Sequence, residues 1–187
     1  MDLPQYKNGR QSGEATLRQQ LTTTSLTEGQ RDAVLLGLTG SSRFVGVQGL
    51  AGTGKTFMIE TLRRYAERAG YDLDGLAPSG RAVEALKEAV PNSTTLQSWL
   101  VQIRAGGAPG VEDKSKRILV VDEAGMLSAA DMRDLMKFAN GAGYARVVLV
   151  GDTKQLDAVA AGQPFTQLQR AGMPTALMAD IQRQRHE

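Results

Sequence analysis

The octapeptide Gly49-Leu50-Ala51-Gly52-Thr53-Gly54-Lys55-Thr56 matches the pattern G-x-x-x-x-G-K-[ST] at every fixed position. It follows an apolar stretch at residues 44–47 and precedes a helical apolar pattern that runs from about Lys55 to Ala69. A strand, a glycine-rich turn and a helix are the setting that this pattern requires. The sequence therefore predicts a phosphate-binding loop (P-loop) rather than a glycine-rich turn with a chance lysine.

The residue types of this loop suit ATP with magnesium. Glycine lets the backbone curl so that successive N–H groups point at phosphate oxygens, and the following helix adds a partial positive charge. We expect Lys55 to reach the β- and γ-phosphates and the Thr56 hydroxyl to ligate Mg²⁺. The predicted nucleotide-binding residues of the loop are Gly49, Gly52, Thr53, Gly54, Lys55 and Thr56.

Two acids, Asp122 and Glu123, directly follow the apolar run at residues 118–121. Such a run is typical of a strand buried on both faces of a parallel sheet, and the carboxyl ends of these strands form the ligand crevice. We expect Asp122 to hold the Mg²⁺ and Glu123 to accept a proton from the attacking water. This pairing favours hydrolysis over transfer to another acceptor. Two exposed acids at the start of a surface loop are the alternative.

A further apolar run, at residues 147–150, leads into Gly151-Asp152-Thr153-Lys154-Gln155-Leu156. This is another strand end that carries polar groups toward the same crevice. The amide of Gln155 could donate a hydrogen bond to the γ-phosphate or to the attacking water, and so distinguish ATP from ADP. A simple turn is the alternative.

Strands and helices alternate along the chain. The expected strands are 44–47, 72–77, 118–121, 147–150 and 175–178, and the expected helices begin near Thr27, Lys55, Arg81, Thr94, Ser128 and Pro164. Glu/Gln three residues after a Ser/Thr predicts capping boxes at Thr27–Gln30 and Thr94–Gln97. The pattern predicts an α/β fold, namely a doubly wound, mainly parallel sheet with helices on both faces.

The chain organisation follows from composition. Met1–Ser25 is polar and has no clear apolar period, so we expect a flexible lead-in or linker over residues 1–25 and a single ordered domain over residues 26–187. The chain has 187 residues, of which 41% are hydrophobic, and this suffices for one core.

Charge and cysteine content exclude some classes of protein. The formal net charge of +2 permits a nucleic-acid partner without indicating one, and the absence of cysteine excludes disulfides and thiolate metal sites. No apolar run approaches the length of about 20 residues that spans a bilayer, and the polar N-terminus does not resemble a signal peptide. We expect a soluble, cytoplasmic protein without a membrane partner.

Taken together, the P-loop, Asp122-Glu123-Ala124, the 151–156 segment and Ile181-Gln182-Arg183-Gln184 resemble the superfamily 1 DNA helicases. The likeness is strongest to the RecD-like branch, which includes the helicase part of conjugative relaxases, and it covers roughly Leu26 to Arg185. It implies a RecA-like P-loop NTPase fold, the first motor lobe of an ATP-dependent helicase. A location in the bacterial cytoplasm and 5′-to-3′ movement on single-stranded DNA are further implications.

The resemblance assigns roles to residues outside the P-loop. It implies that Gln30 contacts adenine, with a helix-cap role as the alternative, and that Arg183 approaches the γ-phosphate. Two segments, 77–82 and 94–100, match family segments that contact the DNA strand. The DNA-contact residues implied in them are Pro78, Ser79, Arg81, Thr95, Ser98 and Trp99. For Trp99 the alternative to base stacking is a place in the core.

The chain departs from the family pattern at two positions. Gln97 stands where many relatives have histidine, so we expect the strand contact at this position to differ from theirs. Gly125 stands where serine often follows the Asp-Glu-Ala triplet, which weakens any coupling through that hydroxyl.

Helicases of this kind hydrolyse ATP between two RecA-like lobes, and no second lobe follows Arg185 in this sequence. We therefore expect a weak ATPase that does not unwind DNA alone, with single-stranded DNA, a second lobe and an upstream relaxase domain as partners. The alternative is a non-motor module that binds nucleotide or single strands and regulates a larger relaxase. A P-loop kinase is disfavoured because no acceptor-binding lid is evident.

Overall fold

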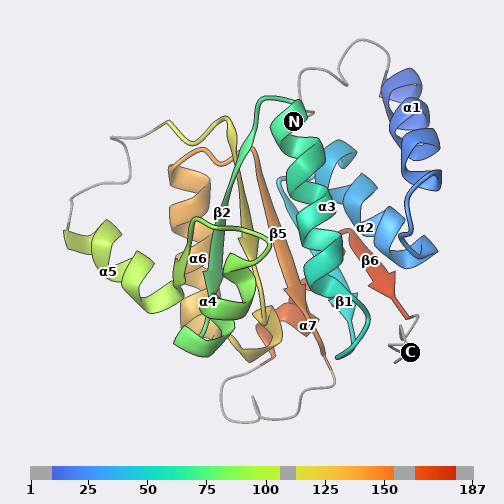
Figure 1. Ribbon diagram of the computed structural model, residues 1–187. Helices are drawn as coiled ribbons and strands as arrows, with labels where there is room; N and C mark the ends of the chain where they lie inside the picture. Colours follow the sequence, from blue (N-terminus) through green and yellow to red (C-terminus); the bar gives the residue numbers. More distant parts are fainter. Residues whose placement is uncertain (1–9, 106–112, 154–162, 180–187) are drawn as a thin grey trace.

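The computed structural model describes residues 10–105, 113–153 and 163–179. Its centre is a six-stranded sheet with the order β3-β2-β4-β5-β1-β6, and every pairing in it is parallel (Figure 1). The strands are β1 (Phe44–Gly49), β2 (Asp72–Ala77), β3 (Ser93–Thr95), β4 (Arg117–Val121), β5 (Arg146–Gly151) and β6 (Thr175–Met178).

Helices cover both faces of the sheet, as the alternating pattern predicts. The described helices are α1 (Arg10–Thr22), α2 (Glu28–Thr39), α3 (Lys55–Arg68), α4 (Gly80–Lys87), α5 (Leu96–Ala105), α6 (Ala129–Gly141) and α7 (Pro164–Arg170), with a 3₁₀ turn, η2 (Ala124–Met126). The helices α1 to α4 share one hydrophobic cluster and α5 to α7 share another. The predicted RecA-like, doubly wound α/β architecture is confirmed.

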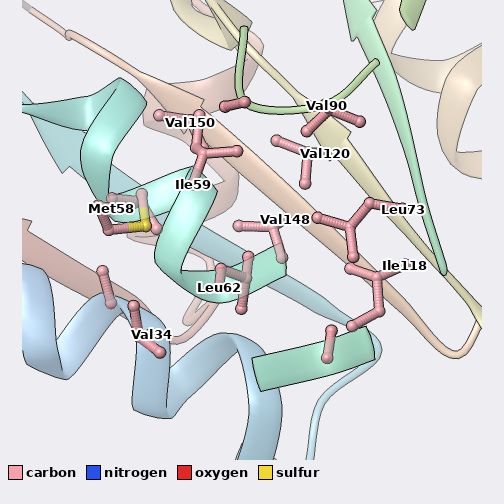
Figure 2. Packing of buried hydrophobic residues seen from close by; sticks show 14 of the residues in the cluster. Val34, Met58, Ile59, Leu62, Leu73, Val90, Ile118, Val120, Val148 and Val150 are labelled. Carbon is pink, nitrogen blue, oxygen red and sulfur yellow. The ribbon is translucent and has the colours of Figure 1, made fainter. Parts of the chain in front are cut away.

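The two clusters meet the sheet through alternate residues of its central strands. In β4, Ile118 and Val120 enter the first cluster, whereas Leu119 and Val121 enter the second. Figure 2 shows Val120, Val148 and Ile59 packed together in the first cluster. Each fully buried Val, Leu or Ile contributes about 1.5–3 kcal/mol, so this double-sided burial fixes the strands that carry the site.

The expectation of a flexible lead-in over Met1–Ser25 is wrong for α1. Leu17 and Leu21 are 1% and 0% exposed and belong to the first cluster. On the same helix, Arg18 forms ion pairs with Glu14 at 3.6 Å and with Asp32 of α2 at 3.8 Å. The helix was missed because its apolar side consists of only two leucines, four residues apart, in a polar stretch.

Two local predictions at the start of α5 need correction. Residues Ser93–Thr95 form the short strand β3, which is too brief and too polar to show a period-two pattern. The helix α5 therefore begins at Leu96, and the Thr95 hydroxyl, rather than that of Thr94, accepts the N–H of Ser98 at 3.1 Å. The capping box of Thr27 and Gln30 in front of α2 is confirmed.

The strand β6 forms one edge of the sheet, and α2 packs closely against it (Figure 1). A Cβ atom on Gly29 would lie 2.4 Å from the carbonyl oxygen of Leu177. The start of α2 can therefore approach the backbone of β6 only because residue 29 has no side chain.

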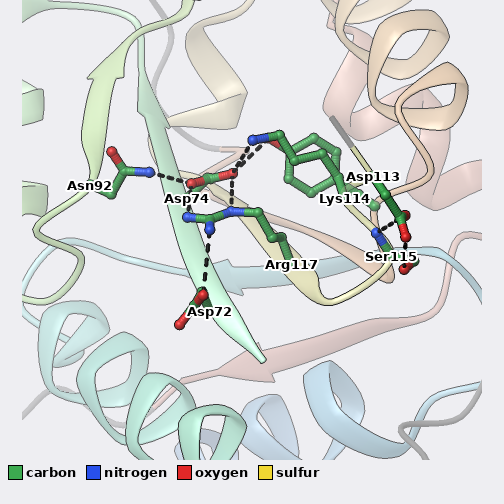
Figure 3. A network of polar contacts seen from close by, with 8 residues as sticks. Asp72, Asp74, Asn92, Asp113, Lys114, Ser115 and Arg117 are labelled. Atoms are coloured by element: carbon green, nitrogen blue, oxygen red, sulfur yellow. Dashed lines mark hydrogen bonds and ion pairs between the residues drawn. The ribbon is translucent and has the colours of Figure 1, made fainter. Parts of the chain in front are cut away.

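A polar network lies near the amino ends of β2 and β4 (Figure 3). Asp74 accepts hydrogen bonds from Arg117 Nε at 2.8 Å and Nη2 at 2.5 Å, from the Tyr144 hydroxyl at 2.8 Å, and from Asn92. Lys114 lies 3.9 Å from the same carboxylate. This network joins β2, β4 and the segment before β5 at the end of the sheet away from the P-loop.

None of the helices in the described part of the chain has the length and apolar character needed to cross a membrane.

Candidate functional site

All six strands are parallel, so their carboxyl ends lie together at one end of the sheet, here called its carboxyl end. The P-loop follows β1, Asp122 follows β4, and Pro78 follows β2. Asp152 follows β5, which lies between β1 and β4. The topology thus gathers at the carboxyl end of the sheet several segments that are spread over residues 49–152 of the chain.

The P-loop owes its shape to two glycines in the left-handed region. Gly52 has φ 79° and Gly54 has φ 74°, and α3 begins at the next residue, Lys55. The Thr53 side chain is buried, and its hydroxyl donates to the carbonyl of Leu50 at 2.8 Å. Thr53 therefore shapes the loop through its side chain and leaves only its backbone for a phosphate.

Gln30 supports this loop from α2. Its side chain is fully buried, and Nε2 donates to the carbonyls of Thr53 at 2.9 Å and Gly54 at 3.4 Å. Its Oε1 accepts the N–H of Thr27 at 2.9 Å. Both ends of the amide are thus bonded within the protein, which favours the cap role. The adenine contact that the resemblance implies stays a prediction and would require these bonds to be exchanged.

The two side chains expected to meet the phosphates and the metal differ in exposure. Lys55 is half-buried, and its Nζ donates to the carbonyl of Gly49 at 3.2 Å, so the ammonium group already lies over the loop. The Thr56 side chain is exposed on the first turn of α3. The Thr56 hydroxyl and the Asp122 carboxylate are oxygen donors of the kind that Mg²⁺ prefers, so the residues fit that ion.

Asp122 stands where β4 leaves the sheet, and its N–H donates to the carbonyl of Leu76 in β2 at 2.9 Å. Its Oδ1 accepts the N–H of Glu123 at 2.9 Å. Burial raises the pKa of Asp122, while this hydrogen bond and the charge of Lys55 act in the opposite direction. The influence of Lys55 shows that the acid and the P-loop lysine share one electrostatic environment.

Glu123 has an unusual backbone. Its φ of 52° and ψ of 35° make it the one non-glycine residue with positive φ in the described part of the chain. Such a conformation costs about 1–2 kcal/mol, so the surrounding structure must hold it. Burial and the charge of Asp122 raise the pKa of Glu123, whereas the charges of Lys55 and Arg81 lower it. A raised pKa brings a carboxylate closer to the range of a general base.

Comparison with known proteins agrees with this arrangement. The profile of the AAA domain family matches residues 25–187. The chain belongs to this family.

Relatives of this AAA domain include two conjugation proteins and a DNA helicase. The domain is 39% identical over 160 residues to the conjugal transfer protein TraA of Rhizobium radiobacter (84% of this chain, 14% of the relative). It is 38% identical over 171 residues to the multifunctional conjugation protein TraI of Escherichia coli (87% and 10%). It is 31% identical over 157 residues to the ATP-dependent RecD2 DNA helicase of Deinococcus radiodurans (83% and 22%). The resemblance to RecD-like helicases and conjugative relaxases is confirmed, and the chain spans 10% to 22% of these relatives.

Solved structures show the same fold at lower identity. The AAA domain superposes on the Pif1 helicase of Candida albicans with a TM-score of 0.61 at 20% identity, covering 84% of this chain and 40% of that one. Domain III of the Thermotoga maritima replication initiation protein DnaA gives 0.54 at 14% identity, covering 84% and 65%.

The first predicted DNA-contact segment of the AAA domain lies beside the acids. Ser79 caps α4, with its hydroxyl accepting the N–H of Ala82 at 3.2 Å, and Pro78 is half-buried. Arg81 is exposed on the first turn of α4, and its charge influences the pKa of Glu123. The proposed strand contact and the proposed base therefore lie within electrostatic reach of each other.

The second segment is more engaged within the protein. The Thr95 hydroxyl bonds to the hydroxyl of Ser98 at 2.8 Å, although Ser98 is exposed. Trp99 is half-buried and packs against the second cluster, as the core alternative predicts. Gln97 donates to Asp131 of α6 at 3.0 Å. The DNA contacts of Thr95, Ser98 and Trp99 stay predictions.

Gln155 and Arg183 of the AAA domain fall outside the described residues. Two further residues lie at the site: Gln48, which no sequence motif singled out, and Asp152, which belongs to the predicted 151–156 segment but was given no role of its own. Gln48 is the next-to-last residue of the otherwise apolar strand β1, directly before Gly49, and its Nε2 donates to Asp152 Oδ1 at 3.3 Å. A polar residue at this place in an apolar run was the signal that could have indicated it.

Proposed function

We propose that this AAA domain is the ATP-hydrolysing first motor lobe of a helicase that moves on single-stranded DNA within a conjugative relaxase-helicase. One observation carries the proposal: Lys55 of the P-loop and the acid pair Asp122–Glu123 lie at the same carboxyl end of the parallel sheet, where the charge of Lys55 acts on the pKa of both acids. The named relatives, which are conjugation proteins and a DNA helicase, support the biological setting.

The proposed chemistry is hydrolysis of the γ-phosphate. Water attacks the γ-phosphorus, the bond to the β,γ-bridging oxygen breaks, and ADP and phosphate leave. Glu123 takes the proton of the water, and Lys55 offsets the negative charge on the β- and γ-phosphates. Mg²⁺, when held by Thr56 and Asp122, supplies further neutralisation of phosphate charge. Gln155 and Arg183 are proposed to approach the γ-phosphate, as the family pattern implies.

The proposed DNA partner lies next to this chemistry. Asp122 is bonded through its N–H to Leu76, two residues before Pro78, and Arg81 acts electrostatically on Glu123. A phosphate of the strand at Arg81 would therefore change the field at Glu123. A second RecA-like lobe and a relaxase domain are the proposed protein partners, and movement from 5′ to 3′ in the bacterial cytoplasm is proposed from the resemblance to RecD-like helicases.

The test is a titration of the chain with a fluorescent ATP analogue and Mg²⁺, with and without oligo-dT. Lys55→Ala removes the phosphate contact, while Lys137→Ala, an exposed lysine on α6, is the matched control. We expect binding by the wild type and by Lys137→Ala, loss of binding in Lys55→Ala, and an affinity that shifts when oligo-dT is added.

The outcomes separate the candidate functions. Binding that Lys55→Ala does not weaken would contradict the P-loop assignment. Nucleotide binding that oligo-dT leaves unchanged, with no phosphate released from ATP, would favour a non-motor regulatory module. We expect slow hydrolysis without unwinding from this chain alone, since the proposed second lobe completes the motor.

A further inference from the structure

The end of β5 is in direct backbone contact with the turn that follows Glu123. A Cβ atom on Gly125 would lie 2.6 Å from the carbonyl oxygen of Asp152. A Cβ atom on Gly151 would lie 2.8 Å from the backbone nitrogen of Gly125. These neighbours are backbone atoms, which cannot move aside as the tip of a side chain can. The turn η2 therefore rests on Gly151 and Asp152 at a distance that only glycine permits.

The same end of β5 is also held from β1, on its other side. Gln48 Nε2 donates to Asp152 Oδ1 at 3.3 Å, and Gln48 Oε1 accepts the N–H of Thr153 at 3.3 Å. Gln169 of α7 donates to the same Oε1 at 3.4 Å. Because Gln48 directly precedes Gly49, the first residue of the P-loop, the Gln48 side-chain amide connects the start of the P-loop to Asp152.

The group that needs support is Glu123. Glu123 has a left-handed backbone and directly precedes η2. The N–H of Met126, the last residue of η2, donates a hydrogen bond to the Glu123 carbonyl at 2.9 Å. If η2 moved away from β5, the backbone of Glu123 could relax to an ordinary conformation, and its carboxylate would turn with it.

We propose that Gln48, Gly125 and Asp152 are positioning residues for ATP hydrolysis. They form a junction between the ends of β1, β4 and β5 that holds Glu123 at a fixed place relative to the P-loop. They act through Glu123 and touch neither nucleotide nor metal. The inference rests on the proposed function and adds the residues that set the geometry of its base.

The chain offers a matched control for the glycine contact. A Cβ atom on Gly46, also in the sheet, would lie 2.7 Å from Thr175 Oγ1 and 3.0 Å from Met173 Cε. Gly46→Ala therefore introduces a close contact at nearly the same distance, against side-chain rather than backbone atoms, between β1 and β6 and away from η2. A general loss of packing should affect both variants, whereas a loss of positioning should affect Gly125→Ala alone.

The experiment compares Gly125→Ala and Gly46→Ala in the complete chain. We expect Gly125→Ala to lower the rate of ATP hydrolysis by about 10- to 100-fold, the scale expected for a displaced catalytic group, with Mg·ATP affinity nearly unchanged. Hydrogen–deuterium exchange without nucleotide should be faster at the Met126 amide. Gly46→Ala should lower the melting temperature but leave hydrolysis per folded molecule and Met126 exchange at wild-type values.

Gln48→Leu tests the junction from its other side without adding bulk. We expect faster exchange at the amides of Thr153 and Met126 and a smaller loss of hydrolysis than in Gly125→Ala. The double variant should lose less than the product of the two single effects, because both changes release the same contact.

The outcomes are distinguishable from failure of the proposed function. If the wild type does not hydrolyse ATP, the proposed function fails, and the exchange rates in the nucleotide-free protein still decide whether the junction holds η2. Wild-type exchange at Met126 in both Gly125→Ala and Gln48→Leu would overturn the inference. An equal loss of hydrolysis in Gly125→Ala and Gly46→Ala would also overturn it, because it would indicate general packing.

Discussion

The two ends of the sheet use polar side chains in opposite ways. At the amino end, the Asp74 carboxylate accepts hydrogen bonds from Arg117 and Tyr144. The guanidinium of the fully buried Arg146 donates hydrogen bonds to the carbonyls of Gly37 and Ser42. These groups bond to one another within the protein. They join β2, β4 and β5 to the neighbouring segments.

At the carboxyl end the backbone is bonded internally, but key side chains are not fully buried. The carbonyls of Thr53 and Gly54 accept hydrogen bonds from the Gln30 side chain, and the N–H of Asp122 donates to the Leu76 carbonyl. The side chains of Thr56 and Arg81, in contrast, are exposed. The difference teaches that one end fixes the strands and the other keeps donors and acceptors available for a ligand. Substitutions at the amino end should therefore change stability, and substitutions at the carboxyl end should change chemistry.

The sharpest test of this division is Glu123→Gln. The amide keeps the shape of the side chain but cannot take a proton, so we expect hydrolysis to fall by about 10²- to 10⁴-fold. ATP affinity and the midpoint of denaturant unfolding should stay close to those of the wild type. Glu88→Gln, an exposed glutamate at the end of α4, is the control. Unfolding at markedly lower denaturant in Glu123→Gln would contradict the division.

The corresponding change at the amino end is Asp74→Ala. It leaves Arg117 and Tyr144 without their shared acceptor, and breaking a buried pair of this kind costs about 3 kcal/mol. Asp72→Ala is the matched control, because Asp72 pairs with the same Arg117 at 3.4 Å but its side chain is 74% exposed. We expect less than about 1 kcal/mol from the control in urea unfolding. Equal effects would show that burial is not what gives the network its strength.

The pH dependence of stability should report the same network. Burial raises the pKa of Asp74, but hydrogen bonds from Arg117 and Tyr144 and the charges of Arg117 and Lys114 outweigh it, so the folded pKa lies below the ordinary value. The stabilisation is therefore present above about pH 4, the pKa in the unfolded chain, and is lost as the pH falls through the folded value.

Asp74→Asn removes this titration while keeping the shape of the side chain. Thermal unfolding measured from pH 6 downward should show a steeper loss of stability in the wild type than in Asp74→Asn. Parallel curves would mean that other carboxylates account for the acid sensitivity.

The smallest expected effect is that of Arg81→Ala on binding of oligo-dT. Loss of one phosphate contact should weaken binding several-fold and reduce the slope of log affinity against log salt by about 0.7. Folding stability should not change, because Arg81 is exposed. Arg64→Ala, an exposed arginine of α3, should leave the slope unaltered. An unchanged slope in Arg81→Ala would remove this residue from the proposed DNA contact.

Elements with a continuous apolar run could be predicted from the sequence. The predicted strands at residues 118–121 and 147–150 lie within β4 and β5, and the P-loop and Asp122–Glu123 lie at the carboxyl end of the sheet. In these places local pattern and tertiary burial agree, so the pattern suffices.

Features that depend on contacts between distant segments could not be predicted. The helix α1 is stabilised by burying Leu17 and Leu21, and β3 by pairing with β2. The left-handed backbone of Glu123 and the close approach of Gly125 to Asp152 have no signature in a single sequence. The partners of these residues become known only when the strands are placed side by side.

The approach of Gly29 to Leu177 has a consequence for self-association. An edge strand presents unpaired backbone groups, which can recruit a strand from another molecule. In this chain the start of α2 lies against the Leu177 carbonyl of the edge strand β6, closely enough that even a methyl group at position 29 would push it away. A substitution of Gly29 would both weaken the packing of α2 and expose the β6 backbone, to which a strand of another molecule could then pair. Damage at this edge should thus be recognised first as aggregation of folded molecules.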